Sequence, residues 1–510
     1  MGKIVTKNEY KKKIKGKLKE EQKKVILCHG VFDLIHPGHI MHFEQAKNMG
    51  DVLVVSVTSE KYVRKGPGRP YFNDELRMKF LESIKYIDYV MLSEGYTVDD
   101  IVETVEPDIY VKGEEYQKPK DDITGKITEE QELVEEHGGC IKFTSGQVFS
   151  STKLINTALS GLPEDVRLYV ERFKTKYSMY DIKEYAHRAE NLKILVVGDI
   201  IIDKYTYCKV QGMMSKDMGY SARLRGMEEH FGGAAAIARH LSGFTENVTL
   251  MSIIGSEEEI RLRMFDELGD RIKLKLIYGE KVSTIVKCRY LTLYEKRDEY
   301  RKIFAINNIP DDLGYEDNVK EKFIQKLVED IKSYDVVFLC DFGHGLVDSR
   351  VMDIVQKYAK YLILNCQTNS SNKGMNIITK YYRADAFTLD EGELLLAYPS
   401  YGLSQKEKLI RLSEHLKGNG WLTMGASGAM QTDNGKIDEC PAFTLSVKDT
   451  VGAGDAFFSL AGIFAASGAP MDIGSFMGNI GGALGANIVG NRESVEKVNA
   501  LKFASTLLNI

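Results

Sequence analysis

The chain has 510 residues, of which 43% are hydrophobic and 28% charged, and its formal net charge is −5. Because one domain spans about 100–200 residues, this length predicts two to four structural units. The near balance of charge gives no sign of a basic surface that binds nucleic acid, so small molecules are the expected partners.

The cysteines and the apolar stretches indicate the compartment. The seven cysteines have no metal-ligand spacing, and an odd number argues against a disulfide framework. The lysine-rich start lacks the apolar run of a secretion signal. Glycines interrupt the apolar stretch 473–489, so it predicts a packed core helix rather than a membrane span. We expect a cytoplasmic protein with no membrane partner.

The first part of the chain predicts a parallel α/β domain. After a basic segment over 1–24, short apolar strands such as 25–27, 52–57 and 109–111 alternate with helical patterns up to residue 160. That alternation predicts a parallel sheet with helices on both faces. The pattern ends at Gly161, and 161–192 is expected to be a charged helical linker.

A second α/β domain is predicted over 193–510. It opens with the apolar strand 193–199, whose end at Gly198-Asp199 is where open sheets place their ligands. Residues 283–290 alternate between apolar and polar at period two, which indicates a half-exposed strand. Such a strand suits a small sheet that covers a site.

Two histidines mark a candidate phosphate site in the first domain. His36 and His39 lie three residues apart, and Pro37 favours a helix start between them. The free amides and the dipole of that helix end favour a nucleoside triphosphate. Imidazole donors can stabilise the charge that develops during nucleotidyl transfer. Taken alone, the pair also fits a surface position or a metal site.

Five segments carry a resemblance to a known family. Residues 29–39, 65–70, 77, 111–116 and 149–153 resemble, in order and spacing, the cytidylyltransferase-like nucleotidyltransferases. The resemblance implies a Rossmann-like domain over 25–160 in which His36, His39 and Lys112 are catalytic. It also implies a nucleotide- and phosphate-binding set, which comprises Gly30, Phe32, Arg77, Ser150, Ser151 and Thr152. Capping of a helix is the alternative role for the hydroxyl turn.

A glycine turn marks a candidate site near the other end. Gly452, Ala453 and Gly454 precede an apolar helical pattern, which places Asp455 in the first turn of a helix. Amides there can hold the oxyanions of a γ-phosphate, and the carboxylate can take a proton from an attacking hydroxyl. The chain has no Walker A sequence that would offer another phosphate loop. Taken alone, such a turn is also an ordinary helix cap.

The glycine turn and four other segments resemble the ribokinase or PfkB family of carbohydrate kinases. The segments are 198–203, 231–234, 341–345, 423–428 and 449–455. The resemblance implies a ribokinase-like α/β domain with a small β lid. By position, Asp455 is the implied catalytic base and the residues from Gly452 to Gly454 are the anion hole. The other implied roles are acceptor binding by Asp203, Gly232 and Gly233, ATP binding near Gly425 and Gly428, and indirect metal binding by Glu393.

Two departures from that kinase family qualify the resemblance. Asp390 stands where many members have an asparagine, and its charge can alter magnesium or phosphate placement. The stretch 234–239 lacks an asparagine that is common in the family, which leaves the acceptor open.

Both halves together resemble the bifunctional heptose 7-phosphate kinase/heptose 1-phosphate adenylyltransferases, with the order of the halves reversed. The resemblance implies ATP-dependent phosphorylation of a heptose-like sugar or sugar phosphate, and nucleotidyl transfer from ATP or CTP to a sugar 1-phosphate. Mg²⁺ is the implied cofactor of both steps, and the kinase family implies a homodimer. The alternatives are a cytidylyltransferase for a polyol phosphate, and a nucleotidyltransferase with a non-catalytic, regulatory kinase-like domain.

Overall fold

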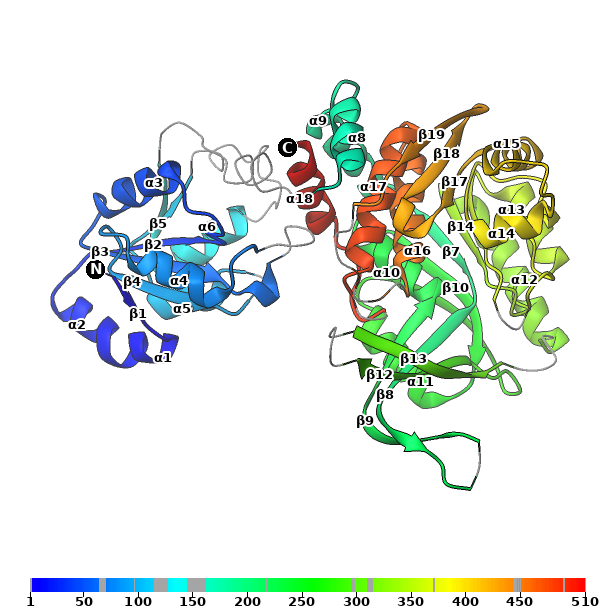
Figure 1. Cartoon of the computed structure of the whole chain (residues 1–510), viewed down its shortest axis with the longest axis horizontal. Coiled ribbons are helices and arrows are strands. Elements are labelled where there is room, and N and C mark those ends of the chain that lie inside the picture. Colours follow the sequence, from blue (N-terminus) through cyan, green and yellow to red (C-terminus); the bar gives the residue numbers. More distant parts are fainter. Residues whose placement is uncertain are drawn as a thin grey trace. The chain divides into compact units, whose positions relative to one another are not determined.

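The computed structural model has two compact units, Met1–Pro163 with Leu501–Ile510, and Glu164–Ala500. Its described residues are 2–63, 70–95, 97–113, 127–144, 162–216, 218–294, 299–309, 315–369, 372–443, 447, 449, 451–488 and 491–509. Both units combine parallel sheets with helices (Figure 1), which confirms the predicted α/β class.

The first unit is built on a six-stranded sheet in the order β1-β4-β3-β2-β5-β6, and neighbouring strands pair in parallel. Its strands are β1 (Lys3–Ile4), β2 (Val25–Gly30), β3 (Val52–Thr58), β4 (Tyr89–Ser93), β5 (Ile109–Lys112) and β6 (Cys140–Phe143). Its helices are α1 (Lys7–Glu9), the π-helix η1 (Tyr10–Ile14), α2 (Lys15–Glu20), α3 (Pro37–Lys47), the 3₁₀-helix η2 (Glu60–Tyr62), α4 (Asp74–Glu82), α5 (Asp99–Val105) and α6 (Ile127–Glu136).

The order of these strands locates the candidate site. The strands from β2 to β4 extend the sheet in one direction, whereas β5 and β6 extend it in the other. Chain order therefore reverses between β2 and β5, and ligands bind at such a switch point beside the carboxyl ends of the strands. The residues after Gly30 and the end of β5 at Lys112 lie at this position.

The basic segment over 1–24 is part of the fold of the first unit. Its β1 pairs with β4, so the segment supplies an edge strand of the sheet. Tyr10 is fully buried, and Ile14 and Leu18 pack against the same core. Their spacing of four residues places the three side chains on one helical face. Lys11, Lys12, Lys13 and Lys17 between them are exposed, whereas Lys15 pairs with Glu106 at 3.0 Å.

The second unit is built on a nine-stranded sheet in the order β11-β10-β7-β14-β15-β16-β17-β18-β19. Its strands are β7 (Ile194–Gly198), β10 (Val248–Gly255), β11 (Lys273–Gly279), β14 (Val336–Asp341), β15 (Tyr361–Cys366), β16 (Ala386–Asp390), β17 (Asn419–Thr423), β18 (Ala429–Asp433) and β19 (Lys436–Cys440). Only the pairs β17–β18 and β18–β19 among these are antiparallel within the described ranges.

Helices cover both faces of this sheet, as Figure 1 shows. They are α8 (Glu164–Lys174), α9 (Met179–Glu190), α10 (Ala234–Ser242), α11 (Glu258–Leu268), α12 (Asp317–Asp330), η4 (Ile331–Ser333), α13 (Ser349–Tyr358), η5 (Ile378–Lys380), α14 (Glu391–Ala397), α15 (Gln405–Leu416), η6 (Gly425–Ser427), α16 (Ala453–Ala466) and α17 (Met471–Gly485). The last helix, α18 (Lys497–Leu508), begins in the second unit and continues in the first.

A separate four-stranded sheet, here called the lid sheet, has the order β13-β12-β8-β9. Its strands are β8 (Ile200–Met213), β9 (Tyr220–Gly233), β12 (Ile285–Tyr294) and β13 (Glu299–Asn308). The hairpin of β8 and β9 extends away from the main sheet (Figure 1). β12 contains most of the alternating stretch 283–290, so the predicted small sheet is confirmed.

The stretch predicted as a linker contains α8 and α9, which belong to the second unit, and α8 packs on α17 of that unit. The Phe173 ring stacks on Phe476 of α17 with ring centroids 4.4 Å apart. Arg172 and Lys176 form ion pairs with Asp438 and Asp472, each at 2.9 Å. The sequence predicts the helices but not the surface on which they pack.

The glycine-rich stretch predicted as a core helix forms α17, which packs closely on α16. A Cβ at position 478 would lie 2.9 Å from the Phe457 ring, and one at 481 would lie 2.7 Å from the Ala456 carbonyl oxygen. The helices can approach this closely because these side chains are absent. In the described part of the chain, no helix is long and apolar enough to cross a membrane.

Candidate functional site

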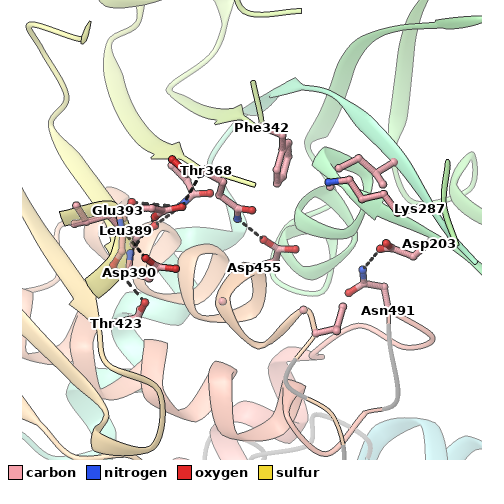
Figure 2. Close-up of a pocket in the computed structure, with 18 of the residues that line it drawn as sticks. Asp203, Lys287, Phe342, Thr368, Leu389, Asp390, Glu393, Thr423, Asp455 and Asn491 are labelled. Carbon is pink, nitrogen blue, oxygen red and sulfur yellow. Dashed lines mark hydrogen bonds between the residues drawn. The ribbon is translucent and has the colours of Figure 1, made fainter. Parts of the chain in front are cut away.

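A cavity of about 310 Å³ in the second unit brings together most of the residues predicted for phosphate transfer (Figure 2). It lies between the lid sheet, the ends of β15 to β17 and the start of α16. The lining residues are Ile201, Asp203, Gly233, Lys287, Arg289, Phe342, Asn365, Gln367, Thr368, Thr388, Leu389, Asp390, Glu393, Thr423, Val451, Gly452, Gly454, Asp455 and Asn491.

Asp455 lies in the first turn of α16, as the sequence predicts. The helix follows Gly452, whose φ of 84° favours glycine, and a Cβ there would lie 2.3 Å from Asn491 Oδ1. Gln367 Nε2 donates to Asp455 Oδ1 over 3.2 Å. Burial, with a further contribution from the charge of Asp203, raises the pKa of Asp455 to about 7. A carboxylate with this pKa can accept a proton near neutral pH.

Asp203 on β8 is held by donors from two distant segments. Arg289 Nη1 on β12 donates to Oδ1, and Asn491 Nδ2 donates to Oδ2 over 3.0 Å. A Cβ at Gly232 would lie 2.1 Å from Oδ2, so only glycine leaves room for this carboxylate. Gly233 lines the cavity at the start of α10. The structure thus brings together the three residues predicted to bind the acceptor.

Asp390 and Glu393 form a capping box at the start of α14. Asp390 Oδ1 accepts the Glu393 N–H over 2.8 Å, and Glu393 Oε2 accepts the Asp390 N–H over 3.0 Å. The Thr368 N–H donates to Glu393 Oε1 over 2.9 Å. Aspartate and asparagine are both good caps, so the departure at Asp390 preserves the local structure. Burial and the charge of Asp390 raise the pKa of Glu393 to about 7.

The predicted ATP-side glycines form the turn between β17 and β18. Gly425 and Gly428 have φ values of 54° and 94°, and a Cβ at 428 would lie 2.1 Å from the Cys440 carbonyl oxygen. Thr423, just before this turn, lines the cavity. Close backbone packing therefore accounts for Gly428, and its place near ATP stays a prediction.

In the first unit, the two predicted histidines lie side by side at the start of α3. His36 is the N-cap and His39 is the third helical residue, and their ring centroids are 3.9 Å apart. The His36 backbone N–H donates to His39 Nδ1 over 3.3 Å. Burial lowers the pKa of His36, which favours the neutral imidazole at pH 7.

Phe32 and Gly30 shape the loop that leads to these histidines. Phe32 has a positive φ of 47°, and its ring lies edge-on to His39 with centroids 5.6 Å apart. A Cβ at Gly30 would lie 3.1 Å from the Phe32 ring. The two residues thus support the position of His39, and their contact with a nucleotide stays a prediction.

Arg77 and Lys112 have protein partners in this structure. Arg77 is 1% exposed, and its guanidinium donates to the carbonyl oxygens of Val31 and Thr58 over 2.6 and 2.9 Å and to Asp74. Lys112, at the end of β5, pairs with Glu130. Arg77 therefore connects the loop after β2 to the end of β3. The predicted phosphate contacts of Arg77 and Lys112 stay predictions. Ser150, Ser151 and Thr152 lie outside the described residues.

Several residues of the cavity were not predicted from the sequence, among them Lys287, Arg289, Gln367 and Asn491. The alternation in 283–290 carried a signal for the first two, because positions 287 and 289 share one face of a strand. Gln367 and Asn491 had no local signal, because each reaches its partner across a long stretch of chain. Among the described residues, no group of three or more His, Cys, Asp and Glu side chains could hold a metal ion.

Comparisons with known proteins agree with the geometry of the first unit. Residues 27–157 match the family model described as cytidylyltransferase-like, which confirms the predicted resemblance. The bifunctional protein HldE of Desulfatibacillum aliphaticivorans is 38% identical over 147 residues, which cover 28% of this chain and 29% of the relative. HldE of Campylobacter jejuni subsp. doylei is 34% identical over 155 residues, covering 29% and 32%. The chain thus spans about a third of the length of these relatives.

Two solved structures resemble the chain at low sequence identity. The ribokinase of Thermotoga maritima has a TM-score of 0.49 and 17% identity, and the match covers 62% of this chain and 99% of that one. A phosphofructokinase-2 mutant from Escherichia coli has a TM-score of 0.49 and 13% identity with the same coverage. Because both TM-scores are below 0.5, we infer the chemistry of the second unit from its cavity and not from these matches.

Proposed function

We propose that the chain is a bifunctional enzyme of nucleotide-sugar biosynthesis. The second unit phosphorylates a sugar or sugar phosphate with ATP. The first unit transfers a nucleotidyl group from ATP or CTP to a sugar 1-phosphate and releases pyrophosphate. One observation supports the kinase activity: Asp455, Asp203 and the Gly452 turn line the same cavity.

The kinase step follows from the roles of these groups. Asp203 binds an acceptor hydroxyl, and Asp455 takes its proton as the oxygen attacks the γ-phosphorus of ATP. The bond from that phosphorus to the bridging oxygen breaks, and ADP leaves. Free amides at the start of α16 stabilise the charge on the transferring group. Burial raises the pKa of Asp455 to about 7, which suits a general base near neutral pH.

Magnesium fits this site only through the phosphates. Mg²⁺ neutralises phosphate oxygens when bound and retains several waters. Both oxygens of Glu393 already accept backbone N–H groups. Glu393 would therefore hold the ion through water rather than directly, as the sequence predicts.

The transferase step relies on donors rather than on a covalent intermediate. His36 and His39 stabilise the α-phosphate of the nucleotide as an oxygen of the sugar phosphate attacks it and pyrophosphate leaves. The adjacent rings and the start of α3 support this role. The match of residues 27–157 to the cytidylyltransferase-like model supports the same chemistry.

Two variants test the division of labour. Asp455→Asn is expected to abolish phosphorylation and leave nucleotidyl transfer intact, and His39→Ala is expected to do the opposite. The assay incubates the protein with ATP, CTP and candidate sugar phosphates and identifies the products by mass. Loss of both activities from either variant, with the protein still folded, would show that the sites are not separate.

The same assay decides between the remaining alternatives. A product from CTP and a polyol phosphate would identify a cytidylyltransferase of that kind. Absence of any ATP-dependent phosphorylation would favour a regulatory second unit, the alternative that the departure at Asp390 supports. A heptose-like acceptor, a homodimer and a cytoplasmic location stay predictions.

A further inference from the structure

Lys287 is a cavity cation without a hydrogen bond to any residue in the described ranges. It lies on β12 in register with Asp203 of β8, and Figure 2 shows it directed into the cavity. Arg289, two positions further along the same face, is already paired with Asp203. Burial lowers the pKa of Lys287. A partly buried ammonium without a hydrogen bond loses part of its hydration, so this position favours an anionic ligand.

The carboxylates of Asp203 and Asp455 accept hydrogen bonds from residues other than Lys287. Asp203 has both oxygens bonded, one by Arg289 and the other by Asn491. Asp455 Oδ1 accepts a hydrogen bond from Gln367 Nε2. Lys287 thus has no carboxylate as its own close partner among the described residues.

The location of Lys287 indicates which anion it meets. Its ammonium interacts electrostatically with the carboxylates of Asp203, Asp199 and Asp455. In the proposed function, the acceptor oxygen lies between the carboxylates of Asp203 and Asp455, and the Gly452 turn lines the same cavity. A phosphoryl group that moves from ATP to that oxygen passes through this space.

We propose that Lys287 contacts the phosphoryl group during its transfer and stabilises its negative charge. This inference rests on the proposed kinase function. The transfer forms one bond from the acceptor oxygen to phosphorus and breaks one bond to ADP, while Asp455 receives the acceptor proton. Lys287 keeps its protons throughout and acts as a point charge from the lid sheet. Its contribution is greatest when charge develops on the transferring group.

The experiment compares ADP with ADP plus aluminium fluoride, a mimic of the transferring phosphoryl group, in the full chain. The wild-type protein should bind the combination more tightly than ADP alone. Lys287→Met should lose that gain while keeping its affinity for ADP, and kcat should fall by about 10²-fold. Lys287→Arg retains the charge and should recover part of the gain. Any nucleotide bound at the first unit contributes equally to all variants.

Lys204→Met is the matched control. Lys204 follows Asp203 on the same strand, so it lies on the opposite face of the lid sheet, and it pairs with Glu229 at 2.6 Å. This variant should bind both probes as the wild type does. Thermal unfolding of each variant checks that the second unit is folded.

Two outcomes would overturn the assignment of Lys287. If Lys287→Met kept the full gain from aluminium fluoride, the residue would not contact the transferring group. If it weakened ADP and the combination equally, Lys287 would support the cavity rather than the reaction. A wild-type protein with neither the gain nor any ATP turnover would instead refute the proposed kinase function, and the inference with it.

Discussion

The side-chain amide of Asn491 donates a 3.0 Å hydrogen bond to Asp203, although 288 positions separate the two residues. The same amide group lies next to the turn before α16, where a Cβ at Gly452 would come within 2.3 Å of Asn491 Oδ1. Asn491 therefore links the candidate acceptor carboxylate to the candidate anion hole.

Asn491→Ala should raise the KM for the acceptor about tenfold, because Asp203 Oδ2 loses its donor at a cost of about 1–3 kcal/mol. The KM for ATP should change less. Steady-state kinetics of the kinase reaction measures both constants. Asn487→Ala is the control, because the Asn487 amide donates within its own segment, to the Ala483 carbonyl oxygen. Equal effects of the two variants would contradict the role of Asn491.

Gly232→Ala should displace the Asp203 carboxylate, because the new Cβ would lie 2.1 Å from Oδ2. We expect a large loss of kcat/KM for the acceptor and an unchanged transferase activity. Gly226→Ala on the same strand is the matched control, because a Cβ there meets no atom within 4 Å. If Gly232→Ala kept full kinase activity, Asp203 would not bind the acceptor in the observed position.

The kinase reaction should depend on the protonation of Asp455. Burial raises its pKa to about 7, and only the ionised carboxylate can accept the proton of the acceptor. The rate constant kcat/KM should therefore rise with pH and level off above 7. Gln367→Leu removes the donor to this carboxylate and should move the rise to higher pH. A pH profile unaffected by this change would exclude Asp455 as the titrating group.

His240 should make the second unit less stable in acid. Burial lowers its pKa to about 3, and its Nδ1 accepts the Val495 N–H over 2.9 Å. The unfolded chain therefore binds the proton more readily, and stability is lost as pH falls below about 6.5 towards the folded pKa. His240→Asn should flatten this slope by up to about 1.4 kcal/mol per pH unit. Urea unfolding at several pH values, followed by the fluorescence of Trp421, measures the slope, and an unchanged slope would contradict the prediction.

Phe173→Ala should lower the free energy of unfolding of the second unit by about 3–5 kcal/mol, because the buried ring stacks on Phe476. The only tryptophan, Trp421, is buried in the second unit and reports its unfolding. Leu168→Ala is the control on the same helix, because Leu168 is 54% exposed. Similar effects of the two variants would show that α8 does not stabilise the second unit.

Local patterns predicted much of the fold and part of each site. The apolar strand at 193–199 appears as β7, and the turn from Gly452 to Asp455 appears as the start of α16. His36 and His39 meet because a helix begins between them. Each of these features depends on residues within a few positions of one another, where periodicity and capping preferences act.

Long-range packing accounts for what the patterns left out. Tyr10 brings the basic start of the chain into the first unit, and the burial of Arg77 follows from loops that converge around it. The sequence by itself determined the α/β class, the helix starts at Gly452 and His36, and the alternation of apolar and polar residues in the lid strand β12. Only the tertiary structure decided that Gln367 contacts Asp455, that Asn491 contacts Asp203 and that Lys287 lines the same cavity, because no local periodicity relates these residues.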